Sequence, residues 1–207
     1  MEEDAYTRNP DLLATAPKPK RLYGYDWQSG LISPYRPAPQ QQLTAALDAV
    51  SLHVHRDQFQ IADLGCGDGV ILFAALDRWK TGLTKVIGIE LDKALLVSIR
   101  EKAGEKDIKR MELWVGDMTG EGSIYPWPEP QDTQRAENKR AIDVLAECSV
   151  VFVYLLPDAL VKLKPLLAEC LQLGAIVVSL QWPIQDLDTS LMCSDPQQGY
   201  YLYKASP

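Results

Sequence analysis

The sequence predicts an α/β fold in which a mostly parallel sheet is covered by helices on both faces. Segments with strand character alternate with segments of helical periodicity over most of the chain, which favours parallel strands joined by crossover helices. Several of the strand segments are apolar throughout, as is typical of strands buried on both faces. A glycine-rich turn, "DLGCGDG", joins the first of these strands to its helix, which is the layout of a nucleotide site.

The expected elements follow one another in the order that such a fold requires. An amphipathic helix over 38–54 comes first, with apolar residues at helical spacing. The segments with strand character are then "FQIADLG", "TKVIGIEL", "RMELWVGD", "CSVVFVYLLP" and "GAIVVSLQW". The segments with helical character between them are "GVILFAALDRW", "DKALLVSIREKAGEK" and "DALVKLKPLLAECL". The last of these contains Pro165, which marks either a first turn or a kink.

The remaining segments suggest the domain organisation. Residues 1–20 are polar and contain proline, which predicts a mobile N-terminal tail, and 21–207 are expected to form one domain. The segment 21–39 is loop-like but aromatic, so it is expected either to cover the core or to act as a lid over a pocket. Proline, glycine and polar residues dominate 119–141, which predicts a long inserted loop, with disorder favoured. The end, 191–206, is expected to form two short strands around a turn.

Composition excludes several classes of protein. The chain has 207 residues, with 21 Lys and Arg against 28 Asp and Glu, and a net charge of −7 disfavours a nucleic-acid partner. No apolar run reaches the roughly 18 residues of a membrane span. The acidic start lacks the apolar region of a secretory signal, so we expect a cytoplasmic or nuclear location. The four cysteines form no C-x-x-C pair and are expected to be reduced thiols, and no metal site is expected.

The glycine turn identifies the kind of ligand to expect. Gly65, Gly67 and Gly69 allow a ligand close to the backbone at the start of a helix. Asp63 precedes this turn, and its carboxylate would repel a diphosphate but attract an ammonium group. The expected ligand is therefore a nucleoside with a cationic amino-acid end rather than a dinucleotide.

Two further acids follow at the ends of the next two strands. Glu90 lies 21 residues after Gly69, close to the spacing at which an acid binds ribose hydroxyls. Asp117 ends the next strand, where it could accept a hydrogen bond from an adenine amino group. Each acid alone is more often a helix cap, but the three together predict a pocket for S-adenosylmethionine (SAM).

The motif "IADLGCGDG", together with Glu90 and Asp117, closely resembles the class I SAM-dependent methyltransferases. The resemblance implies a doubly wound, Rossmann-like sheet of seven strands, mostly parallel, with an antiparallel last strand that "YYLYK" could supply. It also implies that Asp63 and the loop hold the methionine part, that Glu90 holds the ribose and that Asp117 lies near the adenine. The full set of expected cofactor-binding residues is Tyr35, Asp63, Gly65, Cys66, Gly67, Asp68, Gly69, Glu90, Leu91, Asp117 and Met118.

The segment after the fourth strand indicates which kind of methyl acceptor to expect. "VYLLPDAL" lacks the Asn/Asp-Pro-Pro-aromatic motif of enzymes that methylate base or amide nitrogens. With "SPYRPAP" and "GAIVVSLQWPI", it is similar to the small protein-lysine methyltransferases of the ATP-synthase c-subunit and adenine-nucleotide-translocase type and to short bacterial relatives. Tyr154 and Asp158 are the expected catalytic residues, with Tyr35 and Trp182 as walls. Tyr154 could equally be a core aromatic, and Asp158 could equally be a helix N-cap.

Three functions are consistent with these residues. The first is a protein-lysine N-methyltransferase whose partner is a protein that presents a lysine. The second is a methyltransferase with a small-molecule acceptor, and the third is a SAM-binding subunit without catalysis. The intact glycines and acids argue against the third.

Overall fold

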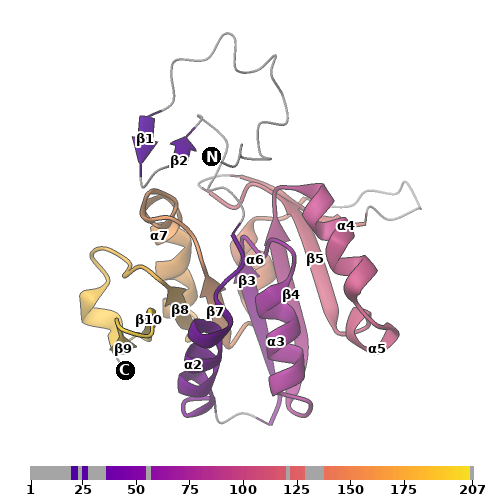
Figure 1. Ribbon diagram of the computed structural model, residues 1–207, viewed down its shortest axis with the longest axis horizontal. Helices are drawn as coiled ribbons and strands as arrows, with labels where there is room; N and C mark the ends of the chain where they lie inside the picture. The colour runs from indigo at the N-terminus through magenta and orange to yellow at the C-terminus, as the bar shows by residue number, and fades with distance from the viewer. Residues whose placement is uncertain are drawn as a thin grey trace. The chain divides into compact units, whose positions relative to one another are not determined.

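The computed structural model describes residues 20–22, 25–27, 36–54, 57–119, 122–128 and 138–205, the first two ranges as backbone only (Figure 1). The chain divides into two compact units, Met1–Arg36 and Pro37–Pro207. In the first unit, β1 (Lys20–Leu22) and β2 (Tyr25–Trp27) pair antiparallel, where the sequence predicted only a loop. Most of the predicted tail and lid lies outside the described residues, so both stay predictions.

The second unit contains an eight-stranded sheet. Its strands are β3 (Phe59–Leu64), β4 (Leu83–Glu90), β5 (Met111–Gly116), β6 (Ile124–Trp127), β7 (Val150–Val153), β8 (Ile176–Leu180), β9 (Leu191–Asp195) and β10 (Tyr200–Tyr203). Their order is β6-β5-β4-β3-β7-β8-β10-β9. The five strands from β5 to β8 in this order are parallel to one another, whereas β10 is antiparallel to both β8 and β9. The predicted antiparallel last strand is therefore confirmed.

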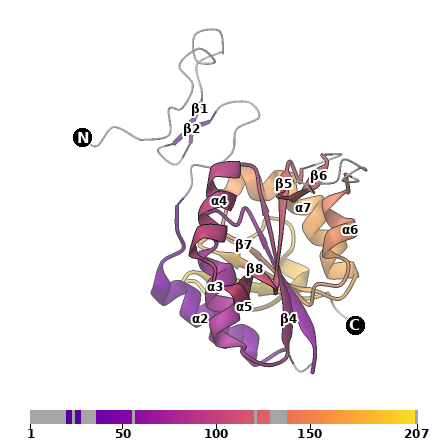
Figure 2. The same ribbon diagram turned by 90° about the vertical axis from the view of Figure 1, so that its right-hand side faces the viewer.

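Helices cover both faces of this sheet, as predicted. They are α2 (Gln40–Ser51), α3 (Val70–Arg78), α4 (Lys93–Lys102), α5 (Glu105–Ile108), α6 (Ala141–Leu145) and α7 (Pro157–Gln172), with the 3₁₀ turn η1 (Asp188–Ser190) before β9. Figures 1 and 2 show α2, α3 and α4 on one face and α6 and α7 on the other. This arrangement is the doubly wound architecture, in which each crossover helix buries one apolar stripe against the strands.

The eighth strand corrects the prediction for the inserted loop. The segment 119–141 was expected to be a loop without regular structure, but β6 (Ile124–Trp127) pairs antiparallel with β5 at the edge of the sheet. Two cation–aromatic contacts fix this edge: the Arg100 guanidinium lies 5.9 Å from the Trp127 ring centre, and the Lys139 ammonium lies 5.5 Å from that of Trp114. Burial of aromatic surface stabilises the strand despite the unfavourable composition around it.

Three predicted elements have different limits in the structure. The helix expected over 92–106 is two helices, because α4 ends before Gly104 and α5 begins after it. The strand expected over 148–157 ends at Val153, and α7 begins at Pro157. Pro165 therefore lies inside α7 rather than in its first turn. Its missing N–H would have bonded the carbonyl of Val161, a residue that is 50% exposed on the outer side of the helix.

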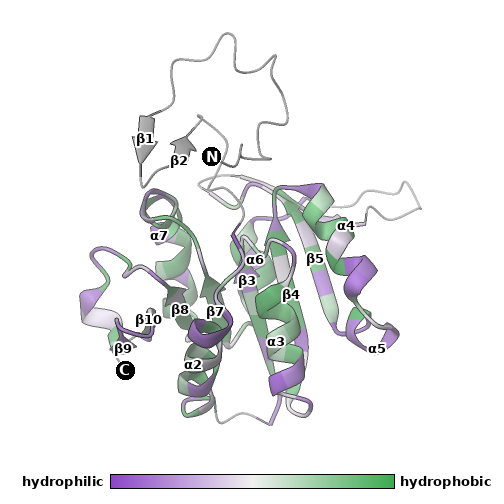
Figure 3. Cartoon of the chain, in the orientation of Figure 1, coloured by the Kyte–Doolittle hydropathy of each residue, from purple (hydrophilic) through white to green (hydrophobic). Residues whose placement is uncertain are grey.

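The main core lies between the sheet and the helices α2, α3 and α4, which cover one of its faces. Figure 3 shows apolar residues concentrated on β3, β4, β7 and α3. Fully buried members of this core include Leu43, Val50, Ile61, Leu72, Ile99, Phe152 and Val178. Gly88 in β4 allows close packing in this core, because a Cβ at this position would lie 2.8 Å from the Cys66 sulfur. The core thus reaches directly beneath the glycine turn.

Candidate functional site

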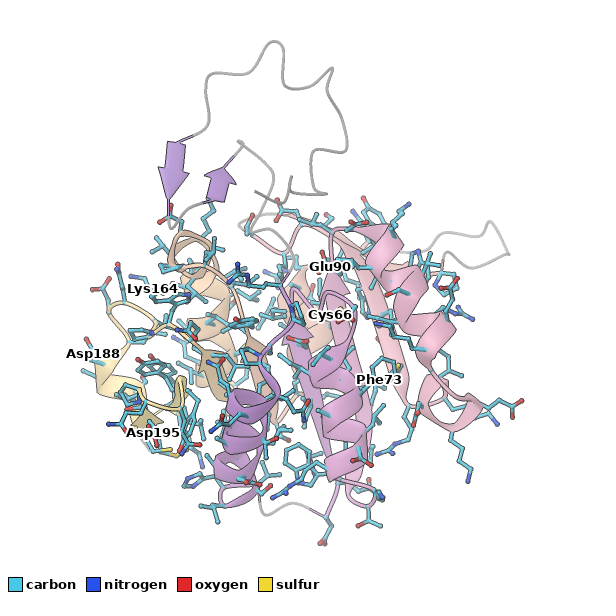
Figure 4. The ribbon with its side chains drawn as sticks, in the orientation of Figure 1. Cys66, Phe73, Glu90, Lys164, Asp188 and Asp195 are labelled. Atoms are coloured by element: carbon cyan, nitrogen blue, oxygen red, sulfur yellow. The ribbon has the colours of Figure 1, made fainter. Side chains whose placement is uncertain are left out.

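The candidate site lies where the parallel strands of the sheet end. β3 lies at the centre of the sheet, and the chain continues outward to β4 on one side and to β7 on the other. Such a switch in direction leaves a crevice at the carboxyl ends of the strands, which is where ligands bind in open α/β sheets. Figure 4 shows Glu90 and Cys66 near each other at this edge.

The glycine turn has a backbone conformation that residues other than glycine rarely adopt. Gly65, Gly67 and Gly69 have φ angles of 77°, 54° and 84°, in the left-handed region that favours glycine. The N–H groups of Gly65 and Cys66 donate to the carbonyl of Ile89 in β4, at 2.9 and 3.1 Å. The turn is thereby attached to the neighbouring strand, and α3 begins directly after Gly69.

Asp63 is the most unusual residue of the site. Its side chain is 2% exposed, and among the described residues it is the only fully buried Asp, Glu, Lys or Arg. Its Oδ1 atom is buried and has no hydrogen-bond partner among the residues that the structure describes. Burial, and then the negative charges of Glu90 and Asp68, raise the pKa of this carboxyl well above its ordinary value. A cationic ligand group would relieve both penalties.

Glu90 links the turn to the next strand end. Its Oε2 accepts the N–H of Gly67 at 2.9 Å, and its Oε1 accepts the N–H groups of Leu91 and Asp92 at 2.7 and 3.1 Å. Each carboxylate oxygen has two lone pairs, so Oε2 retains acceptor capacity for a ligand hydroxyl. Glu90 therefore both shapes the glycine turn and presents an acceptor at the edge of the crevice.

The remaining predicted cofactor residues have different surroundings. Leu91 is 36% exposed directly after β4, an apolar surface suited to a flat ring. The Oδ1 of Asp117 accepts the N–H and the hydroxyl of Thr119, at 2.8 and 2.7 Å, and Asp117 itself is exposed. Met118 follows it and is half-buried. Tyr35 lies outside the described residues, so its role stays a prediction.

Two residues of the turn have side chains directed away from a ligand. The Cys66 thiol is buried against Gly88 in the core, and burial raises its pKa, so any contact of Cys66 with a ligand would have to come from its backbone. The Asp68 carboxylate forms an ion pair with Lys102 of α4, with 2.5 Å between Oδ2 and Nζ. Ile99, one turn earlier in α4, packs against Gly69: a Cβ there would lie 3.0 Å from its Cγ1. One face of α4 therefore holds the turn.

The predicted catalytic residues follow β7, next to the glycine turn. Leu155 packs directly on Gly65, and this contact brings the segment 154–158 to the side of the crevice opposite Glu90. Tyr154 is half-buried and packs against the main core. Asp158 is exposed in the first turn of α7, and the N-cap position belongs to Leu156. The alternative interpretation of Asp158 as the N-cap is thus wrong, because the N-cap lies two residues earlier.

The end of β8 lies next to the end of β7 in the sheet. The Ser179 hydroxyl is fully buried and donates to the carbonyl of Trp182 at 2.6 Å. Lys164 of α7 pairs with Asp186 at 2.6 Å, and the N–H of Ile184 donates to the Tyr203 hydroxyl at 2.8 Å. These bonds hold the loop after β8 in a defined position. Trp182, predicted as a wall, lies in this loop.

Sequence reasoning missed Lys102, Leu155 and Ser179. Lys102 is one of several lysines in a charged helix, and nothing in the local pattern distinguishes it from its neighbours. Leu155 belongs to an apolar segment with strand character, which gives no sign of a contact with the turn. The one available signal was Ser179, a hydroxyl inside the apolar run "AIVVSL", because a buried hydroxyl requires a partner.

Comparison with known proteins supports the fold directly. No protein-family model and no curated protein matches the chain. An RNA methyltransferase from Salinibacter ruber, solved with S-adenosyl-L-homocysteine, has 24% identity and a TM-score of 0.55, over 81% of this chain and 91% of that one. A precorrin-6y C5,15-methyltransferase from Geobacter metallireducens has 17% identity and a TM-score of 0.43, over 66% and 59%. The first likeness confirms the predicted Rossmann-like methyltransferase fold.

Two kinds of feature are absent from the described residues. None of the helices there has the length and apolar character to cross a membrane. Within the same ranges, no group of three or more His, Cys, Asp and Glu side chains is placed to hold a metal ion.

Proposed function

We propose that the protein is a SAM-dependent methyltransferase. The observation that carries the proposal is the buried Asp63 carboxyl, whose Oδ1 has no partner among the described residues and which lies beside a turn of three left-handed glycines. A buried, unpaired carboxyl is unfavourable unless a ligand supplies the missing hydrogen bond and an opposite charge. The α-ammonium group of SAM would do so.

The other residues of the crevice fit the rest of the cofactor. Glu90 Oε2 has acceptor capacity for a ribose hydroxyl, and the exposed side chain of Leu91 next to it would pack on the adenine ring. Asp117, at the end of the next strand, is exposed and could accept from the adenine amino group. The backbone N–H groups at the start of α3 suit the carboxylate of the methionine part. The donor set thus matches a nucleoside with a zwitterionic tail.

The cofactor supplies a methyl group on a positively charged sulfur. The chain's own residues supply alignment, because an in-line displacement depends on the approach of the acceptor lone pair. The segment 154–158 suits this task, since Leu155 fixes it against the glycine turn and Tyr154 follows the strand end directly. A half-buried phenol and an exposed carboxylate could orient an amine and accept its proton.

We further propose that the acceptor is the ε-amine of a protein lysine. The net charge of −7 favours approach of a basic protein segment over approach of a polynucleotide. The segment "VYLLPD" resembles that of small protein-lysine methyltransferases and lacks the Asn/Asp-Pro-Pro triplet. A lysine has a free pKa of about 10.4, so the site must stabilise the neutral amine, for which half-buried apolar surroundings are suited.

The test is methyl transfer from radioactive SAM in a cell lysate. The lysate is divided into protein, RNA and small-molecule fractions after incubation with the purified protein. Label in a protein band, located on lysine by mass spectrometry, is the expected result. Label confined to RNA or to metabolites would reject the lysine proposal and retain the methyltransferase. Calorimetry that detects no binding of SAM or S-adenosylhomocysteine would reject both proposals.

A further inference from the structure

Three carboxyl groups surround the glycine turn, and their partners differ. Asp68 pairs with Lys102 at 2.5 Å, and Glu90 accepts three backbone N–H groups. Asp63 is the most deeply buried of the three, and its Oδ1 has no partner among the described residues. Within the described part of the chain, two of the carboxylates are therefore bonded to a cation or to backbone N–H groups, and the third has an oxygen without a partner.

Among the residues that the structure describes, the groups that face Asp63 from the neighbouring elements do not supply a positive charge. In the sheet register, Asp63 lies beside Gly88 of β4 and Phe152 of β7, both uncharged. The charges that act on it are those of Glu90, at the end of β4, and of Asp68 in the turn. Lys102 of α4 is bonded to Asp68, and the Cys66 thiol beside the turn has a raised pKa and is neutral. Burial and these two charges all favour the protonated carboxyl of Asp63, and they raise its pKa.

We propose that Asp63 carries a proton in the ligand-free protein and releases it to solvent when the cationic end of the cofactor binds. This inference rests on the proposed function. In the complex, the Asp63 carboxylate faces the ligand ammonium, and the proton that it held passes to buffer. Binding of one ligand thus releases up to one proton.

The coupling makes cofactor affinity dependent on pH. By linkage, a ligand whose binding releases one proton gains up to tenfold in affinity for each unit by which pH rises. The affinity stops rising at the pH values at which Asp63 is already ionised in the ligand-free protein. An unprotonated Asp63 would give an affinity that does not change with pH below the pKa of the ligand's own amine, about 7.7–8.0.

Calorimetry with S-adenosylhomocysteine measures this proton directly. Titrations are made at pH 5.5, 6.0, 6.5 and 7.0, each in two buffers of different ionisation enthalpy, so that the heat difference gives the number of protons released. We expect proton release at the lowest of these pH values, and an affinity that increases with pH wherever protons are released. 5′-Methylthioadenosine lacks the amino-acid end and is expected to bind without proton release.

Variants of the protein test whether the proton that is released on binding comes from Asp63. Glu90→Gln removes a neighbouring negative charge and is expected to shift the release profile to lower pH. Asp195→Asn, at the end of β9, is the matched control and should leave the profile unchanged. Asp63→Asn should bind more weakly and release no proton.

The possible failures are distinguishable. Binding of S-adenosylhomocysteine with no proton release at any of the four pH values overturns the inference and leaves the proposed function intact. Undiminished release by Asp63→Asn also overturns it, because the proton then belongs to another group. Absence of any binding by the unmodified protein overturns the proposed function itself.

Discussion

Leu155 fills the space above Gly65: a Cβ on that glycine would lie 2.8 Å from the Leu155 Cδ2 atom. The two residues belong to different strand ends, one after β3 and one after β7. Their contact joins the proposed cofactor loop to the segment that carries Tyr154 and Asp158. The distance between the two halves of the proposed site therefore depends on a glycine.

Gly65→Ala is expected to weaken SAM binding by about tenfold or more. An alanine at a φ of 77° costs about 1–2 kcal/mol, and its methyl group would in addition displace Leu155. Gly174→Ala is the matched control, since Gly174 has a φ of 89° but no atom within 4 Å of the place that an added methyl group would take. Both variants should lose stability in thermal unfolding, Gly65→Ala the more because of the Leu155 contact, and only Gly65→Ala should lose affinity in calorimetry. Equal affinity losses would show that the Leu155 contact has no role in binding.

Glu90→Ala is expected to cost about 1.5–3 kcal/mol of SAM affinity, the scale of hydrogen bonds to a charged group. The loss combines the ribose contact with the bond that holds the Gly67 N–H. Glu90→Gln retains one carbonyl acceptor and should lose less. Glu112→Ala is a suitable control, because Glu112 bonds Lys85 and Trp114 near the start of β5. A Glu90→Ala variant that binds SAM with full affinity would contradict the proposed ribose role.

Asp63→Asn is expected to stabilise the ligand-free protein at neutral pH by about 1–2 kcal/mol while it weakens cofactor binding. The raised pKa of Asp63 means that its favourable contribution to folding is complete below about pH 4, the unfolded value, and is lost as pH rises through the folded value. The stability advantage of the variant should therefore grow with pH. Thermal unfolding between pH 5 and 8 measures it, and a constant difference would show that Asp63 is already ionised in the folded protein throughout this range.

Lys102→Met is expected to loosen the glycine turn only modestly. The Lys102 and Asp68 side chains are 49% and 19% exposed, so their coupling energy should lie in the range of about 0.2–1 kcal/mol that partly exposed pairs show. A double-mutant cycle with Asp68→Asn measures this coupling, and added salt should reduce it. Lys80→Met, in the exposed pair with Asp77, is the control and should show no effect on SAM affinity. A coupling of zero would mean that the ion pair with Lys102 does not help α4 to hold the turn, and that its contribution comes from Ile99.

Tyr154→Phe and Asp158→Asn are expected to reduce turnover by about tenfold or more without a comparable loss of SAM affinity. Both residues lie on the acceptor side, whereas the cofactor is assigned to the ends of β3, β4 and β5. Tyr125→Phe in β6 and Asp188→Asn in η1 are exposed controls that should retain full activity. Single-turnover rates and calorimetry separate the two effects. Unchanged turnover in both variants would remove Tyr154 and Asp158 from the proposed mechanism.

The central fold was predictable because the strands and helices around it have clear periodicity. β7 and β8 are almost wholly apolar, and the glycine turn fixes where β3 passes into α3. The antiparallel β10 was also predictable, since "YYLYK" has high strand propensity. The acids Asp63 and Glu90 were located because each ends a strand, and parallel strands bring their carboxyl ends together.

The parts that sequence reasoning missed depend on contacts between distant residues. The strand β6 contains Pro126 and lies in a polar segment, so local propensity argues against it, yet Trp127 and Arg100 stabilise it from outside. Gly104 interrupts the predicted helix over 92–106, and a single glycine is often tolerated in a helix. The sequence alone could not show that the Asp63 Oδ1 lacks a partner, because this depends on the positions of its neighbours in the fold. From sequence, a strand-end aspartate more commonly caps a helix.

Ile124 and Lys139 exchange both of their backbone hydrogen bonds, at 2.9 and 3.0 Å. This pair closes the segment between them at its base, next to β5. Closure entropy changes only by about 0.6 kcal/mol for each doubling of loop length. Evolution could therefore lengthen or shorten the chain between these two residues at little cost to the domain. The same position is suited to the engineered insertion of a peptide tag or a reporter domain.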